Sequence, residues 1–324
     1  SDLRRQRQMC IRDSFESLVP GTYQIRIHPP DGWAVSPANQ GVDDGVDSDV
    51  SATGFAPLTT LDPGEHDGSW DAGLYRPGSL GDLVWLDTDA DGEQDDGEAG
   101  IAGIEVELLD AGTGDALAST VTDAEGRYGF AELAPGTYRV RVVVPETSRL
   151  SPADASGDDG TDSDMAAETG VSHDVVIVSG TDDMSIDVGL YEPAAVGSHA
   201  WIDANADGFQ DEDEAGLGGV LVRLIGADGQ VVATTTTDHA GAYVFEDLAP
   251  GNYTIEFVTP AGMEVSPLDA VATEGADSDV DPSTGQTAPV ALISGQVDLT
   301  WDAGFTVPTV VLSSPEVNTT TDLA

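Results

Sequence analysis

Two acidic stretches of this chain have the residue types and spacing of a calcium-binding loop. The first runs from Asp87 to Glu98 and the second from Asp203 to Glu214. Each places oxygen-bearing side chains at loop positions 1, 3, 5, 9 and 12, and a glycine at position 6, where the backbone must bend sharply around a cation. Ca²⁺ takes roughly six to eight oxygen ligands, whereas Mg²⁺ needs a tighter octahedron and keeps its waters. We therefore expect one Ca²⁺ site in each loop.

The position of each residue in the loop assigns its role. In the first loop the expected ligands are the side chains of Asp87, Asp89, Asp91, Asp95 and Glu98, with the backbone carbonyl of Glu93. In the second loop the same roles fall to Asp203, Asn205, Asp207, Asp211 and Glu214, with the carbonyl of Phe209. A single aspartate-rich turn is usually a solvated surface loop, but two copies with the glycine and the closing glutamate in register favour metal binding.

A further acidic loop in each repeat is a second candidate for a metal site. It contains Asp154, Asp158, Asp159, Asp162 and Asp164, with counterparts Asp43, Asp44, Asp47 and Asp49 earlier in the chain, and Glu274, Asp277 and Asp279 later. Its spacing matches no named loop, although its length suggests that something must order it. We weigh a weaker Ca²⁺ site, completed by residues of the main loop, against a solvated acidic loop. An aspartate in each closing strand, Asp71, Asp187 or Asp302, is either a ligand or an acceptor that fixes a turn.

Composition restricts the partners. The net charge is -49, and the 11 basic residues are all arginine, which argues against nucleic acid or an anionic membrane surface and favours cations. One cysteine, Cys10, forms no disulfide within the chain, and no apolar run reaches the roughly 20 residues needed to span a bilayer. The five histidines occupy non-equivalent positions without zinc spacing, and no Gly-x-Ser-x-Gly or phosphate-binding motif is present. We expect no catalytic activity.

An internal repeat organises the chain. Phe15–Tyr23, Phe130–Tyr138 and Phe245–Tyr253 match one another at a spacing of 115 residues, which suits tandem domains rather than a solenoid. We divide the chain into the second half of a repeat (15–77), two complete repeats (78–193 and 194–308) and a tail (309–324). Residues 1–14 hold four of the 11 arginines and do not fit the repeat. We expect residues 1–14 to be a foreign or disordered segment, and the alternative is a functional basic arm.

Within a repeat, apolar and polar residues alternate with the period of a half-buried strand, as in Ile104–Leu108 and Tyr253–Phe257. Glycine, proline and aspartate turns separate about seven such strands, and no convincing helix is present. This predicts an all-β chain of tandem Ig-like or prealbumin-like β-sandwich domains. The linkers Tyr75–Pro77 and Tyr191–Pro193 are short and contain proline, which limits the angle between domains and predicts a rod. Trp85 and Trp201 precede the acidic loops and are expected to pack in the core or at a domain junction.

These features together resemble a known family. The Gly-x-x-x-Trp first strand, the acidic loop, the Thr-Asp-x-x-Gly-x-Tyr-x-Phe hairpin, the Leu-x-Pro-Gly-x-Tyr strand and the Asp-Ser-Asp loop occur in the same order in both complete repeats. They resemble the SdrD B-like repeats of bacterial surface adhesins, which are calcium-stabilised relatives of the collagen-adhesin B-type, transthyretin-like β-sandwich. The resemblance covers Phe15 to about Pro308. It implies a stalk between a ligand-binding head and the cell envelope, and therefore a secreted or cell-surface location.

The chain departs from this family pattern in two respects. Many collagen-adhesin B-type relatives cross-link themselves through a Lys–Asn isopeptide bond, which a chain without lysine cannot form. No head or wall anchor is visible, so adhesion itself is not carried over. We expect a calcium-stabilised stalk that is a monomeric rod, with Ca²⁺ as its partner and with surface or matrix proteins or glycans contacted through other domains. The alternatives are a glycan- or protein-binding module and a biofilm-matrix spacer.

Overall fold

The computed structural model of the chain describes residues 14–40, 46–153, 155, 160–268 and 277–308. These residues form strands and turns without a helix, and therefore contain no helix that could cross a membrane. Residues 1–13 and the tail 309–324 lie outside the described residues. So do six residues of the second acidic loops: Asp43, Asp44, Asp154, Asp158, Asp159 and Glu274.

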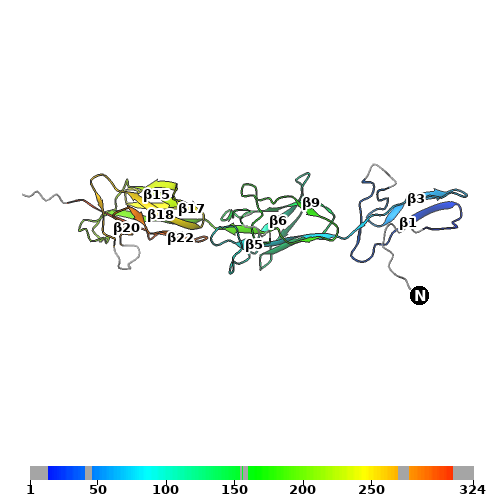
Figure 1. Cartoon of the computed structure of the whole chain (residues 1–324), viewed down its shortest axis with the longest axis horizontal. Coiled ribbons are helices and arrows are strands. Elements are labelled where there is room, and N and C mark those ends of the chain that lie inside the picture. The colour runs from blue at the N-terminus through cyan, green and yellow to red at the C-terminus, as the bar shows by residue number, and fades with distance from the viewer. Residues whose placement is uncertain (1–13, 41–45, 154, 156–159, 269–276, 309–324) are drawn as a thin grey trace, which may run out of the picture. The chain divides into compact units, whose positions relative to one another are not determined.

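The second repeat is a sandwich of two sheets. Its strands are β5 (Gly78–Leu86), β6 (Glu105–Asp110), β7 (Ala116–Val121), β8 (Arg127–Leu133), β9 (Gly136–Val142), β10 (Arg149–Leu150), β11 (Val175–Ile177), β12 (Asp182–Asp183) and β13 (Val188–Tyr191). One sheet has the order β10-β13-β5-β12, with β8 also paired to β5, and the other has the order β11-β9-β6-β7. Figure 1 labels β5 of the first sheet and β6 and β9 of the second. β13 runs parallel to β5, with Val188 opposite Val84, so the end of the repeat returns to its beginning.

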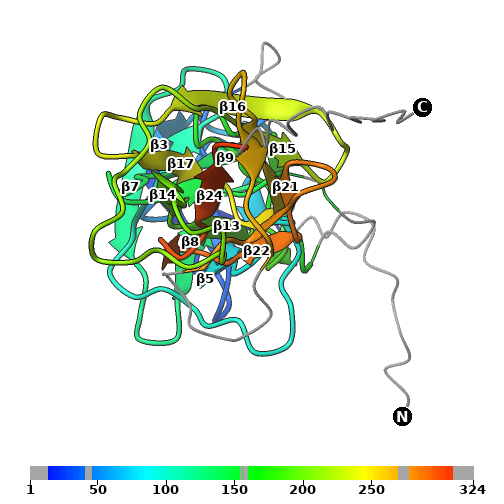
Figure 2. The same ribbon diagram turned by 90° about the vertical axis from the view of Figure 1, so that its left-hand side faces the viewer.

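The third repeat has the same arrangement. Its strands are β14 (Ala194–Ile202), β15 (Leu221–Gly226), β16 (Val231–Thr236), β17 (Ala242–Leu248), β18 (Gly251–Val258), β19 (Glu264–Val265), β20 (Val280–Asp281), β21 (Gln286–Thr287), β22 (Val290–Leu292), β23 (Val297–Asp298) and β24 (Ala303–Thr306). One sheet contains β17-β14-β24-β19 with β23, and the other β16-β15-β18-β21-β20 with β22. Figure 2 shows β14 and β24 side by side, and Trp201 lies opposite Gly304 in this parallel pair.

Alternation of side chains fills the space between the two sheets. On β6 the side chains of Val106 and Leu108 are buried, whereas that of Glu105, the first residue of the strand, is exposed. Trp85 and Trp201 are fully buried, which confirms core packing. Trp85 fits because the closing strand offers Gly189, where an added Cβ would lie 2.9 Å from the indole ring. Counting strands of three or more described residues, each complete repeat has seven, as the sequence predicted.

Residues 14–77 form a smaller body. β1 (Gly21–Arg26) pairs with β3 (Phe55–Leu61), and β2 (Ala34–Val35) pairs with β4 (Leu74–Tyr75). Its buried cluster consists of Val35, Val50 and Ala56, with Ile25, Ile27, Trp70 and Leu74 packed against it.

Candidate metal centre

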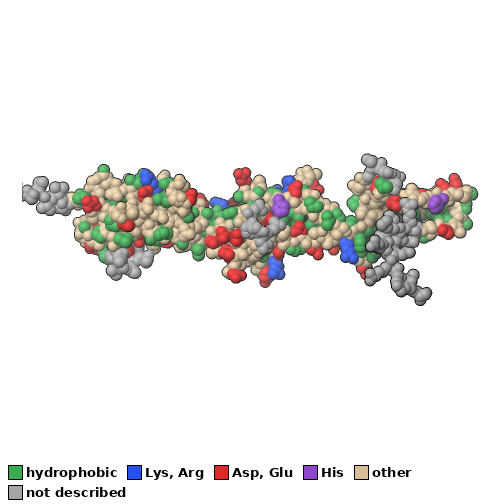
Figure 3. Space-filling view, viewed as in Figure 1, with side chains coloured by type: hydrophobic (Ala, Val, Ile, Leu, Met, Phe, Trp, Pro, Cys, Tyr) green, Lys and Arg blue, Asp and Glu red, His purple; other side chains and the backbone are tan. Residues whose placement is uncertain are grey.

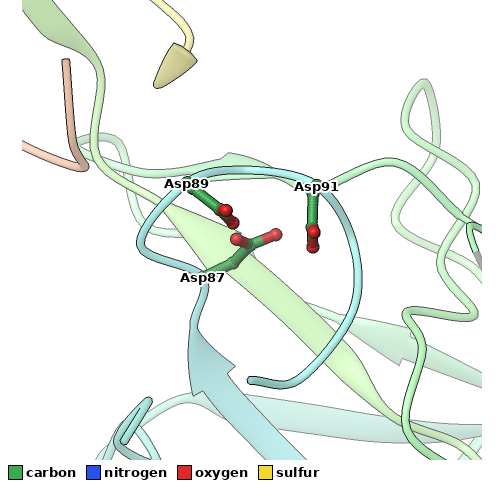
Figure 4. Close-up of side chains that lie close together, drawn as sticks. All are labelled: Asp87, Asp89 and Asp91. Carbon is green, nitrogen blue, oxygen red and sulfur yellow. The ribbon is translucent and has the colours of Figure 1, made fainter. Parts of the chain in front are cut away.

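The first acidic loop begins directly after β5, and its first three acidic side chains converge. Carboxylate oxygens of Asp87, Asp89 and Asp91 all lie within 4.8 Å of one another. Figure 4 shows the backbone curling around them, with the three side chains turned inward. Carboxylate oxygens at such separations can share one cation of the size of Ca²⁺. The structure thus brings together loop positions 1, 3 and 5, as their spacing predicted.

The loop backbone is held by its own terminal carboxylates. Asp87 accepts hydrogen bonds from the backbone N–H of Ala90 at 2.6 Å and of Gly92 at 2.9 Å. Glu98 accepts from Thr88 N at 2.5 Å and from Asp95 N at 3.1 Å, which closes the loop. These bonds preorganise the loop, and each carboxylate oxygen retains a further lone pair for a metal.

Position 6 of the loop is glycine for two physical reasons. Gly92 has φ of +87°, a conformation that side chains rarely adopt. An added Cβ would also lie 2.3 Å from the carbonyl oxygen of Pro152, so the loop passes too close to its neighbour for any side chain. Ala90, at position 4, also has a positive φ of 58°, which the spacing did not predict.

The electrostatics of this loop favour a cation. Asp87 is fully buried, and none of the ion pairs among the described residues involves Asp87, Asp89 or Asp91. Burial raises the pKa of Asp89, and the neighbouring charges of Asp91 and Asp87 raise it further. Burial likewise raises the pKa of Glu98. An uncompensated buried carboxylate costs several kcal/mol, which a bound cation would offset.

The second loop repeats the backbone geometry of the first, with a different side chain at position 3. Gly208 has φ of +85°, and Asp203 is 1% exposed and accepts from Ala206 N at 2.6 Å and Gly208 N at 3.0 Å. At position 3, however, Asn205 donates its amide to Asp207 at 2.8 Å and to Asp211 at 3.1 Å. This amide separates two carboxylates, and it must rotate to present its oxygen to a metal.

The second acidic loops lie directly beside the main ones. Ser163 N donates to Gly92 O at 3.0 Å, and Ser278 N donates to Gly208 O at 3.0 Å. Isolated bridges also pair Glu93 with Asp162 and Phe209 with Asp277, so the residues expected to offer carbonyl ligands contact the second loop in both repeats. Asp162 and Asp277 are buried at these positions. That either one binds metal remains a prediction.

The second aspartate of each Asp-Ser-Asp triplet has a structural role that the sequence did not reveal. Asp164 accepts from the backbone N–H of Asp187 at 2.7 Å, and Asp279 accepts from that of Asp302 at 2.7 Å. Within residues 14–77, Asp49 accepts a hydrogen bond from the backbone N–H of Asp71 at the same distance of 2.7 Å. This bond fixes the closing strand against the acidic loop in all three copies.

The closing-strand aspartates themselves have different surroundings in the two complete repeats. Burial, followed by the charge of Asp82, raises the pKa of Asp187 to about 8. In the third repeat the equivalent Asp302 lies 2.8 Å from His199 Nδ1, and this hydrogen bond raises the pKa of His199. The sequence carried a signal for this difference: Leu83 stands in the second repeat where His199 stands in the third.

Acidic side chains also gather on the surface of the second repeat, in the middle of the view in Figure 3. Among the described residues, arginines of the two complete repeats form four surface ion pairs, such as Arg141 with Glu107 at 2.5 Å. Exposed pairs of this kind contribute about 0–1 kcal/mol each to stability.

The family model described as SdrD B-like domain matches residues 12–74, 78–190 and 194–305. A serine-aspartate repeat-containing protein F of Staphylococcus epidermidis is 37% identical over 298 residues, which are 90% of this chain and 16% of that protein. A serine-aspartate repeat-containing protein D of Staphylococcus aureus strain Newman is 36% identical over 297 residues, 90% of this chain and 21% of that protein. The chain therefore spans about a fifth of the length of these relatives.

Solved structures of low sequence identity are also similar. The minor pilin GBS52 of Streptococcus agalactiae has a TM-score of 0.29 and 13% identity, over 74% of this chain and 99% of that one. The shaft pilin SpaA of Lactobacillus rhamnosus GG has a TM-score of 0.25 and 9% identity, over 73% and 99%. At these scores the likeness supports no argument about the arrangement of the repeats.

Proposed function

Because the chain belongs to the family of SdrD B-like domains, we propose that its repeats form a calcium-stabilised, non-catalytic spacer of a secreted or cell-surface protein. One observation carries this proposal. In each complete repeat the aspartate at loop position 1, Asp87 or Asp203, is buried, and in the first loop Asp89 and Asp91 lie beside it. Burying a carboxylate beside other carboxylates is unfavourable unless a cation neutralises them, which favours a structural cation.

The ion would act by stabilising the folded repeat. The unfolded chain does not hold the loop carboxylates together, so Ca²⁺ binds the folded form preferentially and shifts the folding equilibrium. A hundredfold excess of free ion over the dissociation constant stabilises the folded form by about 2.7 kcal/mol. Asp87, Asp89, Asp91, Asp95 and Glu98 would hold the ion in the second repeat, with the carbonyl of Glu93. Since the chain has no lysine, a Lys–Asn cross-link cannot stabilise these domains, and a bound metal ion would stabilise them instead.

The linkers support a stiff spacer. Arg76 donates its backbone N–H to Ser179 Oγ at 2.9 Å and accepts from Gly180 N at 2.9 Å. Glu192 makes the same pair of bonds, to Ser294 Oγ at 2.8 Å and from Gly295 N at 2.9 Å. A linker residue fixed by two hydrogen bonds has less conformational freedom than a free peptide. On this basis we propose restricted motion at the linkers.

A glycan- or protein-binding module has less support. Such a module would present exposed aromatic side chains on its loops. Among the described residues of the two complete repeats, no large aromatic side chain is exposed; the exposed ones, Phe15, Trp33 and Phe55, all lie within residues 14–77. A spacer in a biofilm matrix would use the same physical properties as a cell-attached stalk, and full-length termini would distinguish the two.

The test compares the full chain in Ca²⁺ and in chelator, by calorimetric melting and by the length derived from X-ray scattering. We expect chelator to lower the melting temperature and to change the scattering-derived length. Asp87→Asn and Asp203→Asn together should reproduce the effect of chelator while Ca²⁺ is present. An unchanged melting temperature and length in chelator would exclude a calcium-dependent spacer.

A further inference from the structure

A hollow of about 500 Å³ lies on the third repeat, over β15 and β18, which Figure 1 labels. Six of its lining residues give it its chemical character: Ile225, Asn252, Tyr253, Thr254, Gln286 and Pro289. None of the described residues that line the hollow is charged, although the chain carries a net charge of -49. None of them belongs to an acidic loop, so the hollow is separate from the candidate metal centre.

The pairing of the strands places these side chains on the outer face of their sheet. Ile255 is fully buried in the core, so Thr254, which precedes it on β18, points outward. Ile225 lies directly opposite Thr254, and Gln286 lies opposite Glu256, two residues further along β18. Residues that are opposite one another or two apart share a face, so an apolar side chain, a hydroxyl and an amide lie together there.

The second repeat fills the same place with an ion pair. Arg139, at the position of Thr254, donates from Nε to Asp174 Oδ1 at 2.5 Å. Asp174 in turn stands where the third repeat has Pro289. Leu109 lies opposite Arg139 and is only 5% exposed, because the aliphatic stem of an arginine covers apolar surface beside it.

The absence of this ion pair uncovers the hollow in the third repeat. Ile225 is half-buried, whereas its leucine counterpart in the second repeat is buried. No hydrogen bond among the described residues uses the side-chain amide of Asn252 or of Gln286. The hydroxyl of Tyr253, in contrast, is donated to Ala249 O at 2.8 Å. The two amides are therefore available to a ligand, each with two N–H donors and one carbonyl acceptor.

The lining favours a neutral ligand that has both hydroxyl and apolar groups. Without a carboxylate the hollow lacks the oxygen donors that hold a hard cation, and the negative chain repels anions. Amides suit hydroxyl groups, because a hydroxyl both donates and accepts, and the apolar side chains suit C–H groups. The volume of about 500 Å³ is within the roughly 300–1,000 Å³ of small-molecule sites. A sugar ring combines these properties.

We propose that this hollow binds a neutral saccharide. The amides of Asn252 and Gln286 and the hydroxyl of Thr254 bond to its hydroxyl groups, while Ile225 and Pro289 contact its C–H groups. The second repeat does not bind the saccharide, because the ion pair occupies the same place. This binding adds to the spacer function, needs no exposed aromatic side chain, and stands whether or not the acidic loops bind Ca²⁺.

The test applies the full chain to an array of neutral, sialylated and sulfated glycans, and then titrates it calorimetrically with the neutral glycan of strongest signal. The wild type should bind neutral glycans only. Asn252→Ala and Gln286→Ala should each weaken binding about fivefold, the effect of one lost hydrogen bond. Thr254→Arg together with Pro289→Asp copies the second repeat and should abolish binding. The matched control Val171→Ala, at the position of Gln286 in the second repeat, should bind as the wild type.

Each result supports or overturns one part of the proposal. Binding to no neutral glycan, or a preference for the sialylated or sulfated ones, overturns the proposed ligand. Wild-type affinity in both Gln286→Ala and the variant that copies the second repeat overturns the site. An equal loss in Val171→Ala and Gln286→Ala overturns the difference between the repeats. Melting in the same buffer shows whether each variant is folded, and if the double variant is not, the two alanine variants decide.

Discussion

Replacing Gly92 by alanine provides a sharp test of the first acidic loop. An alanine with φ near the +87° of Gly92 costs about 1–2 kcal/mol, because its Cβ crowds the backbone. The same Cβ would lie 2.3 Å from Pro152 O. Overpacking of this kind destabilises the folded state by a further amount of about 1–3 kcal/mol. If this strain acts on the metal-bound loop, the dissociation constant for Ca²⁺ should rise by at least about thirtyfold, at roughly 1.4 kcal/mol per tenfold.

The matched control is Gly114→Ala in the turn between β6 and β7. Gly114 has φ of +76°, and an added Cβ would meet nothing within 4 Å. This variant should lose about 1 kcal/mol of folding stability and keep its calcium affinity. Calorimetric titration of the full chain measures both variants. Wild-type calcium affinity in Gly92→Ala would refute the argument that close packing at loop position 6 shapes the metal site.

Three further predictions concern individual side chains. Asp89→Asn should weaken calcium binding at least about tenfold, whereas Asp96→Asn, at a loop position that offers no ligand, should bind as the wild type in the same titration. Thr122→Val removes a buried hydroxyl that bridges two backbone groups and should cost about 1–3 kcal/mol in chemical unfolding; no loss would refute the bridge. In chelator, stability should fall as the pH rises from about 4 to about 8, because the folded chain raises the pKa of Asp187 from 3.8 to about 8. The contribution of Asp187 to folding stability is complete below its unfolded pKa and is lost as the pH rises through its folded pKa. The melting temperature of Asp187→Asn should therefore depend less on pH than that of the wild type, and an identical dependence would contradict this.

Much of the fold could be predicted from the sequence because it follows from local patterns. Alternation in Ile104–Leu108 predicted that Val106 and Leu108 face the core, and both are buried. The glycine at loop position 6 predicted a sharp bend, and Gly92 and Gly208 both have positive φ. These features depend on neighbours in sequence, so one sequence suffices to find them.

The surroundings of the acidic residues could not be predicted in this way, because they depend on distant segments. Asp187 reaches Leu83 only because β13 lies parallel to β5 across about one hundred residues of chain. The role of Asp164 in holding the closing strand likewise follows from tertiary register. The five histidines occupy non-equivalent sequence positions, and the pairing of His199 with Asp302 depends on a tertiary contact that one sequence does not reveal. The prediction that the Asp-Ser-Asp loops bind metal is not tested by their geometry.

We propose above that Ca²⁺ stabilises the folded repeats through their acidic loops. Its most direct test is a calorimetric Ca²⁺ titration of the full chain, followed by melting of the same sample before and after chelation. We expect at least two bound ions for the two complete repeats, and a melting temperature that rises with Ca²⁺ and falls again in chelator. Fewer than two ions, together with a melting temperature that chelation leaves unchanged, would contradict it.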